Sequence, residues 1–158
     1  MRIAVDAMGG DAAPVEIVKG AVAAARFYTD HEIILVGDQD RIQSELSACG
    51  ATLDNISVVH ASQVVGMNES ATVAVRKKAD SSITKGVKLV AEKAADAVVS
   101  AGNTGATVAA SSLFLRTLEH VKRPGIAVSI PTFHGACMVI DAGANIQCKP
   151  AHLMQYGA

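Results

Sequence analysis

Short apolar runs alternate with segments of helical periodicity along this chain, and the alternation restricts the folds open to it. Residues 3–5, 33–36, 56–59 and 97–100 have the length and apolar content of buried strands. Between the first two runs, Pro14 stands where a first helical residue would, and Val15, Val18, Val22 and Ala25 recur at helical spacing. Strands that alternate with helices predict an α/β fold whose mostly parallel sheet carries helices on both faces, in three αβα layers.

The remaining segments extend the same pattern. Further helices are predicted over 39–48, 70–79, 81–94 and about 104–119, and another begins at Pro150. Two more strands are predicted over 126–130 and 138–140, after the break at Arg123-Pro124-Gly125. The sequence therefore predicts one αβα portion spanning 1–158, and we expect it to be the N-terminal part of a longer protein, without its C-terminal half.

Composition excludes several classes of protein. Of the 158 residues, 50% are hydrophobic and 18% charged, which excludes an intrinsically disordered chain. A net charge of −1 gives no reason to expect nucleic acid as a partner. The three cysteines and five histidines have no metal-ligand spacing, so we expect no metal and a reduced, cytoplasmic protein. The N-terminus enters a strand at once and does not resemble a signal peptide, and no apolar run reaches the ~18 residues of a membrane span.

Residues 96–107 contain the strongest candidate binding site. The run 97–99 leads into a glycine-rich turn, after which small residues can begin a helix. Backbone N–H groups at such a helix start lack partners and favour an anion, above all phosphate. The residues predicted to bind phosphate there are Ser100, Gly102, Asn103, Thr104 and Gly105. The alternative is that the glycines only form a tight turn and Asn103 or Thr104 only caps the helix.

A second glycine-rich loop follows the first strand. Asp6, Gly9, Gly10 and Asp11 lie within six residues and indicate a site loop. The aspartates can position a polar ligand, or orient Lys and Arg groups around a phosphate. A carboxylate repels phosphate, so we expect neither aspartate to be its direct ligand unless protonated. The alternative is a turn in which Asp11 favours the helix N-terminus. The chain has neither a G-x-G-x-x-G fingerprint nor a Walker lysine motif, which argues against a nicotinamide site.

Two further motifs can have either a ligand-binding role or a purely structural one. Arg76 and Lys78, followed by Ser81, are suited to grip a phosphate, or they form a solvated helix face and an ordinary cap. Asp141 and Asn145 can hold a polar ligand, or they stabilise a turn at Gly143. Ligands of parallel α/β sheets bind beyond the carboxyl ends of the strands. The polar segments 6–11, 37–38, 100–105 and 141–145 follow predicted strands, and we expect three of them to converge on one crevice.

The order of these motifs resembles a known family. The segments Ile3-Ala-Val-Asp-Ala-Met-Gly-Gly-Asp11 and Ser100-Ala-Gly-Asn-Thr-Gly-Ala106 carry most of the resemblance. Between and after them come Leu35-Val-Gly-Asp38, Arg76 with Ser81-Ser82, Arg123-Pro124 and Asp141-Ala-Gly-Ala-Asn145. Over essentially all 158 residues, the chain resembles the phosphate acyltransferase (PlsX) family of bacterial phospholipid synthesis.

The resemblance implies an activity. Family members transfer a fatty acyl group from acyl carrier protein to inorganic phosphate and form acyl phosphate. It also implies a homodimer without metal or organic cofactor, peripheral membrane association, and a fold like those of the isocitrate/isopropylmalate dehydrogenases and phosphotransacetylases. Ala71 departs from the family, which often has proline there, and family chains are about twice as long.

On this basis we expect Asn103, Asn145 and Asp6 to act in catalysis, with phosphate held against residues 100–105. Asn145, or a nearby loop N–H, would stabilise the oxyanion, and transfer would proceed without an acyl-enzyme. Two rival functions stay open: a phosphate acetyl- or butyryltransferase that uses acyl-CoA, and a non-catalytic binding or dimerising fragment.

Overall fold

The computed structural model describes residues 1–50, 52–145 and 147–157, and it divides the chain into two compact units. The first unit spans Met1–Leu115 and the second Arg116–Ala158. None of the described helices is long and apolar enough to cross a membrane.

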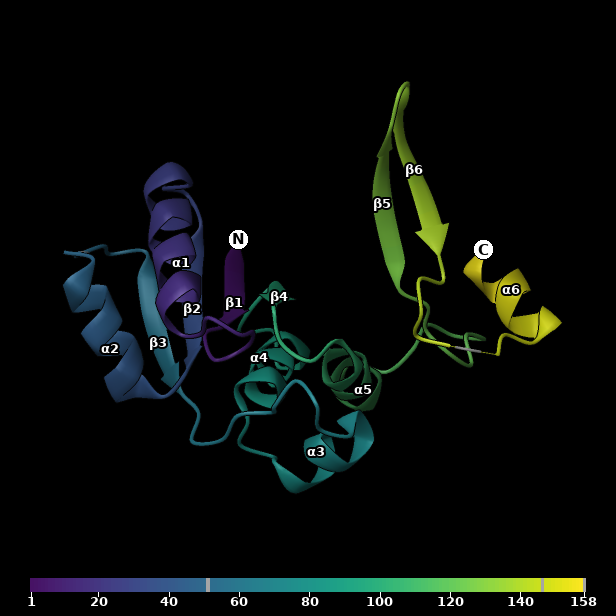
Figure 1. Ribbon diagram of the computed structural model, residues 1–158, viewed down its shortest axis with the longest axis horizontal. Helices are drawn as coiled ribbons and strands as arrows, with labels where there is room; N and C mark the ends of the chain where they lie inside the picture. The colour runs from purple at the N-terminus through teal and green to yellow at the C-terminus, as the bar shows by residue number, and fades with distance from the viewer. Residues whose placement is uncertain (51, 146, 158) are drawn as a thin grey trace. The chain divides into compact units, whose positions relative to one another are not determined.

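A four-stranded sheet forms the centre of the first unit (Figure 1). Its strands are β1 (Arg2–Asp6), β2 (Glu32–Gly37), β3 (Ile56–His60) and β4 (Ala97–Val99). They lie in the order β3-β2-β1-β4, and every neighbouring pair is parallel. The predicted parallel sheet is confirmed for these four runs, and β1 and β4 end side by side although about 90 residues separate them.

Helices cover both faces of this sheet, as predicted for three αβα layers. Ile33 and Leu35 of β2 face one core, with α1 (Val15–Phe27) and α2 (Gln39–Ala48). Ile34 and Val36 face the opposite core, with α4 (Ser82–Ala91). This alternation follows from the two-residue period of side chains along a strand. Two further helices, α3 (Ala71–Lys77) and α5 (Thr104–Phe114), pack with α4 around a third apolar cluster.

Side-chain caps explain where several helices begin. The Asp38 carboxylate accepts a hydrogen bond from the N–H of Arg41 at the start of α2. Ser81 and Asn103 cap α4 and α5 in the same way. Each cap satisfies an N–H that has no partner within its helix.

The second unit differs from the sequence prediction. Strands β5 (Ala127–Thr132) and β6 (Gly135–Ile140) form an exposed antiparallel hairpin, not further strands of the parallel sheet. Only Phe133 and His134 separate them, which is too short for the crossover that parallel strands require. The helix α6 (Pro150–Tyr156) begins at Pro150, as predicted.

The end predicted for α5 was also wrong. The helix ends at Phe114 and not near residue 119. Arg116 and His120 have φ angles of 66° and 67°, a left-handed conformation that a right-handed helix excludes.

Candidate functional site

Hydrogen bonds through Asp6 and Ser100 join the loops that follow β1 and β4. The Ser100 hydroxyl donates to Oδ2 of Asp6 at 2.7 Å and accepts from the N–H of Gly102 at 3.0 Å. The other carboxylate oxygen of Asp6 accepts from the N–H of Met8 at 3.1 Å. Asp6 is only 1% exposed. The buried Asp6 carboxylate therefore links the two loops; whether it also orients Lys or Arg groups around a phosphate stays a prediction.

The same two loops approach so closely that only glycine fits between them. A Cβ atom added to Gly9 would collide with the Asp6 carboxylate and would lie 2.8 Å from the amide nitrogen of Gly102. Gly10 adopts a φ of +104°, which side-chain-bearing residues rarely adopt. Close contacts therefore explain why both predicted site loops have glycine at these positions. Asp11, which follows Gly10, is exposed.

The start of α5 lies directly after this junction. The N–H of Ala106 is capped by Oδ1 of Asn103 at 2.9 Å. The N–H groups of Thr104 and Gly105 have no hydrogen-bond partner among the residues that the structure describes, and both residues are exposed. These amides and the positive end of the helix dipole provide the donors that an anion requires.

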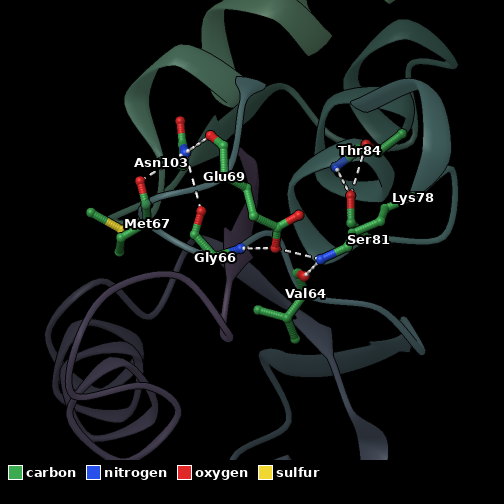
Figure 2. Close-up of polar contacts among 8 residues, drawn as sticks. All are labelled: Val64, Gly66, Met67, Glu69, Lys78, Ser81, Thr84 and Asn103. Carbon is green, nitrogen blue, oxygen red and sulfur yellow. Dashed lines mark hydrogen bonds and ion pairs between the residues drawn. The ribbon is translucent and has the colours of Figure 1, made fainter. Parts of the chain in front are cut away.

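The amide group of Asn103 is occupied within the protein. Its Nδ2 donates to the backbone carbonyls of Gly66, Met67 and Glu69, each at 3.1 Å (Figure 2). With Oδ1 engaged as the helix cap, this side chain offers no free donor to a phosphate. Asn103 therefore fixes the loop that contains Gly66 and Glu69 against the start of α5, which is the role of a positioning residue.

An ion pair fastens the other side of this loop. The Lys78 ammonium group contacts the Glu69 carboxylate and donates to the carbonyl of Val64 at 2.7 Å (Figure 2). The same carboxylate accepts from the N–H of Gly66 at 2.7 Å. The hydrogen bond from Lys78, followed by that from Gly66, lowers the pKa of Glu69. Lys78, a predicted phosphate ligand, is therefore committed to the loop in this conformation.

Ser81 and Arg76, the two other predicted phosphate ligands of this segment, differ in their exposure to solvent. Ser81 is fully buried, and its hydroxyl donates to Oγ1 of Thr84 at 2.8 Å and accepts from the Thr84 N–H. It caps α4 (Figure 2), and because it is fully buried it is closed to a ligand. Arg76 lies in the last turn of α3, is exposed, and forms no salt bridge to any described residue. It is the predicted cation that is free to meet an anion.

Asp141 and Asn145 belong to the second unit. The Asp141 carboxylate accepts from the N–H groups of Ile126, Ala144 and Asn145. Burial raises the pKa of Asp141, but these hydrogen bonds outweigh burial and hold it below its usual value. Its role is thus that of the turn former that the sequence left as an alternative.

Asn145 is likewise engaged inside the second unit. Its Nδ2 donates to the Pro124 carbonyl at 3.1 Å, to the Asp141 carboxylate at 3.2 Å and to the Tyr156 hydroxyl at 2.8 Å. It therefore has no amide proton to spare for an oxyanion in this conformation. The predicted convergence of this turn with the loops of the first unit stays a prediction.

Sequence reasoning missed the 64–69 loop as part of the site. Its carbonyls lie 34 to 37 residues before Asn103 in the chain. No local spacing marks backbone carbonyls as partners of a distant asparagine, so only the tertiary structure could place them. Among the described residues, no group of three or more His, Cys, Asp or Glu could hold a metal ion.

Comparison with known proteins shows the family. The model of the family described as "Fatty acid synthesis protein" matches residues 1–158. The chain belongs to this family. Curated relatives named phosphate acyltransferase include one from Geotalea uraniireducens, 53% identical over 156 residues, and one from Halothermothrix orenii, 47% identical over 156 residues.

The matches cover 99% of this chain but only 45% and 47% of these two relatives. The chain thus spans about half the length of the curated family members that it matches. A phosphotransacetylase structure from Streptococcus pyogenes is similar at a TM-score of 0.71 and 20% identity, covering 99% of this chain and 51% of that one. This likeness supports the phosphotransacetylase-like α/β fold that the sequence predicts.

Proposed function

We propose that this chain takes part in phosphate acyl transfer, with inorganic phosphate bound at the start of α5. The observation that carries the proposal is the pair of unpartnered amides of Thr104 and Gly105, within the described residues, at the junction of the β1 and β4 loops. Relatives over the same residues are named phosphate acyltransferase, which supports phosphate as the ligand.

In the proposed reaction a phosphate oxygen attacks the carbonyl carbon of an acyl thioester. A carbon–oxygen bond forms, the carbon–sulfur bond breaks, and the thiolate leaves with the electron pair. The proton of the attacking hydrogen phosphate ends on the thiolate, so the products are acyl phosphate and the carrier as a free thiol. Neutral amide donors suit a bound nucleophile, since they orient it with less loss of electron density than several close cations would cause.

The residues around the amides have supporting roles in this proposal. Asp6 and Ser100 hold the glycine turn, and Asn103 holds the 64–69 loop beside it. Gly105 is also close to the start of α3, since a Cβ added to it would lie 3.0 Å from the Cβ of Ala71. Arg76, in the last turn of α3, supplies a cation that forms no salt bridge with a described residue.

We further propose that the donor is a fatty acyl group on acyl carrier protein, and that the protein acts as a cytoplasmic homodimer with peripheral membrane contact. These expectations come from the family resemblance. The alternative donor is acyl-CoA, as in acetyl or butyryl transfer to phosphate. The assay described next distinguishes between these two donors.

The test is hydroxylamine trapping of acyl phosphate as hydroxamate. Acyl carrier protein thioester and phosphate are incubated with the 158-residue chain and, as a positive control, with the Geotalea uraniireducens relative. Parallel reactions contain palmitoyl-CoA or acetyl-CoA. Phosphate-dependent hydroxamate from the carrier thioester supports the proposal. Hydroxamate from acetyl-CoA alone favours the alternative. If only the relative forms hydroxamate, these 158 residues do not perform the reaction by themselves.

A further inference from the structure

The β5–β6 hairpin of the second unit carries apolar side chains on both of its faces (Figure 1). Directly opposite residues share a face, so Val128 and Val139 lie on one face, and Ser129 and Met138 lie on the other. Both strands are exposed at every position, and residues 127–140 contain no Asp, Glu, Lys or Arg. A two-stranded hairpin is at best marginally stable alone, and an uncharged apolar surface of this kind is typical of one that another segment covers.

The sequence of β6 is that of a strand covered on both faces. It reads Gly-Ala-Cys-Met-Val-Ile, so five apolar residues follow one another. Alternation of polar and apolar residues indicates a strand with one solvated face, whereas a near-continuous apolar run indicates a strand with both faces buried. Met138 and Ile140 lie on one face of β6 and Val139 on the other, and they are 62%, 41% and 38% exposed. In the 158-residue chain β6 therefore lacks the cover that its sequence suits.

The direction of the backbone groups distinguishes the two edges of the hairpin. Just before β5, the carbonyl of Ile126 accepts a hydrogen bond from the N–H of Ala142, so the backbone of Ile126 faces the strand that pairs with β5. The backbone groups of successive residues in an antiparallel pair alternate between the two edges of their strand. Val128 therefore faces β6 as well, whereas Ser129 and Pro131 face away from it.

Pro131 marks β5 as the outer strand of the pair. Proline has no N–H, and within sheets it occurs on edge strands with its nitrogen directed away from the ladder. The outward edge of β5 thus lacks one donor, which protects it from pairing. The outward residues of β6 are the register partners of those of β5, namely Ala136, Met138 and Ile140, and each has both an N–H and a C=O. Among the strands that the structure describes, none pairs with this edge of β6.

The length of the relatives indicates what covers this edge. The relative from Geotalea uraniireducens is matched over 99% of this chain but over only 45% of its own length. More than half of that relative therefore lies outside the match, which is enough for further strands and helices of an α/β unit. A second copy of this chain would supply another β6 edge, but that pairing would leave both faces of the joined hairpins without cover.

We propose that the free edge of β6 pairs with an uncharged, apolar β-strand from the part of the protein that relatives have outside the matched residues, while β5 stays the outer strand. Backbone hydrogen bonds of Ala136, Met138 and Ile140 hold the added strand, and the apolar faces fix its register. The proposal concerns an interaction surface of the second unit and does not rest on phosphate acyl transfer.

Residue-resolved amide hydrogen exchange in the 158-residue chain and in the full-length Geotalea uraniireducens relative tests the pairing. In the 158-residue chain, the outward amides of β6 should exchange about as fast as those of Ala127 and Ser129 on β5. In the relative, the positions aligned with Ala136, Met138 and Ile140 should exchange about 100-fold more slowly than in this chain, and those aligned with Ala127 and Ser129 should not slow. The inward amides of both strands serve as the internal reference.

Co-purification tests the same edge in this chain. The 158-residue chain is co-expressed with the affinity-tagged part of the relative that the match does not cover. Met138→Pro removes an outward donor from β6, and Ser129→Pro makes the same change at its register partner on β5. We expect Met138→Pro to reduce co-purification about tenfold and Ser129→Pro to leave it within about twofold. Circular dichroism of the two variants, each without the tagged part, checks that they fold alike.

Several results would overturn the proposal. One is protection in the relative of the outward β5 positions in place of those of β6, or of neither set. Equal losses in the two proline variants, or no co-purification of the parent chain with a soluble tagged part, would do the same. Outward β6 amides already protected in the 158-residue chain, with a dimer in sedimentation, would assign the edge to a second copy. If the tagged part is insoluble, the exchange result decides alone. Because no turnover is measured, a failed acyl-transfer assay leaves this result independent.

Discussion

The Ser100 hydroxyl donates a hydrogen bond to the Asp6 carboxylate at 2.7 Å, although the two residues are 94 positions apart in the chain. This contact exists because β1 and β4 are neighbours in a parallel sheet, which places their carboxyl ends at one edge. It connects the two glycine-rich loops that the sequence identifies separately. The first prediction therefore concerns how much the hydrogen bond between Ser100 and Asp6 contributes to the stability of the fold.

Replacing Ser100 by alanine removes the donor to Asp6 and the acceptor for the Gly102 N–H. Hydrogen bonds to charged groups contribute more than neutral ones, so we expect the free energy of unfolding to fall by about 1.5–3 kcal/mol. Urea unfolding followed by circular dichroism measures the change. Ser44→Ala, on the exposed face of α2, is the matched control and should stay within about 0.5 kcal/mol. Equal effects of the two variants would contradict a special role for Ser100.

Gly9→Ala tests the close approach of the loops. The added Cβ would collide with Asp6 and lie 2.8 Å from the Gly102 nitrogen, so we expect a loss of about 1–3 kcal/mol of stability. Gly20→Ala is a control of opposite sign. It lies within α1, with nothing within 4 Å of the added Cβ, and should stabilise by about 0.5–1 kcal/mol. Thermal and urea unfolding of both variants give the comparison, and a neutral Gly9→Ala would show that the loops can separate freely.

Asn103 variants separate its two structural roles. Asn103→Ser retains a capping oxygen for Ala106 but loses the donors to the 66–69 carbonyls, whereas Asn103→Ala loses both. We expect Asn103→Ala to cost about 1 kcal/mol more in stability than Asn103→Ser.

Both Asn103 variants should raise the KM for phosphate in the trapping assay, because the loop beside the amides is released. The assay is made in whichever chain, the 158-residue protein or the longer relative, forms hydroxamate. An unchanged KM in Asn103→Ser would separate the 64–69 loop from phosphate binding.

Because of the Lys78–Glu69 pair, we expect the free energy of unfolding to depend on pH in the acidic range. The hydrogen bond from Lys78 lowers the pKa of Glu69 in the folded protein below its usual 4.5. A carboxylate with a lowered folded-state pKa stabilises the fold above the unfolded value, and this contribution is lost as the pH falls from about 4.5 through the folded pKa. Glu69→Gln should therefore be less stable than the parent near neutral pH, with a difference that shrinks in acid.

Urea titrations at several pH values measure this difference. Glu92→Gln serves as the control, since Glu92 is an exposed carboxylate at the end of α4 and forms no salt bridge with a described residue. Its difference from the parent should show little change with pH. A Glu69→Gln difference that grows in acid would contradict the lowered pKa of Glu69 in the folded protein.

Much of the first unit could be predicted because the residues that determine each helix and strand lie within that element or next to it. The apolar runs of β1 to β4 and the caps Asp38, Ser81 and Asn103 lie within the segments that they organise. Helical periodicity and a glycine-rich turn after a strand are likewise properties of neighbouring residues. The candidate phosphate loop was identifiable for this reason.

The roles of the site residues could not be predicted in the same way. Whether Lys78 and Ser81 face a ligand or the protein depends on Glu69, Val64 and Thr84. Their type and order suit either role, and only the path of the 64–69 loop decides between them.

Periodicity and local backbone chemistry were enough to predict, from the residues alone, the parallel β1–β4 unit, its flanking helices and the glycine turn at the start of α5. The packing of distant segments was needed to show that Asn103 holds a loop 34 to 37 residues earlier in the chain, and that Arg123, Lys149 and His152 line one cavity. The physical reason is that hydrogen-bond partners and cavities are set by which segments pack together, and this pairing leaves no mark in the local order of residues.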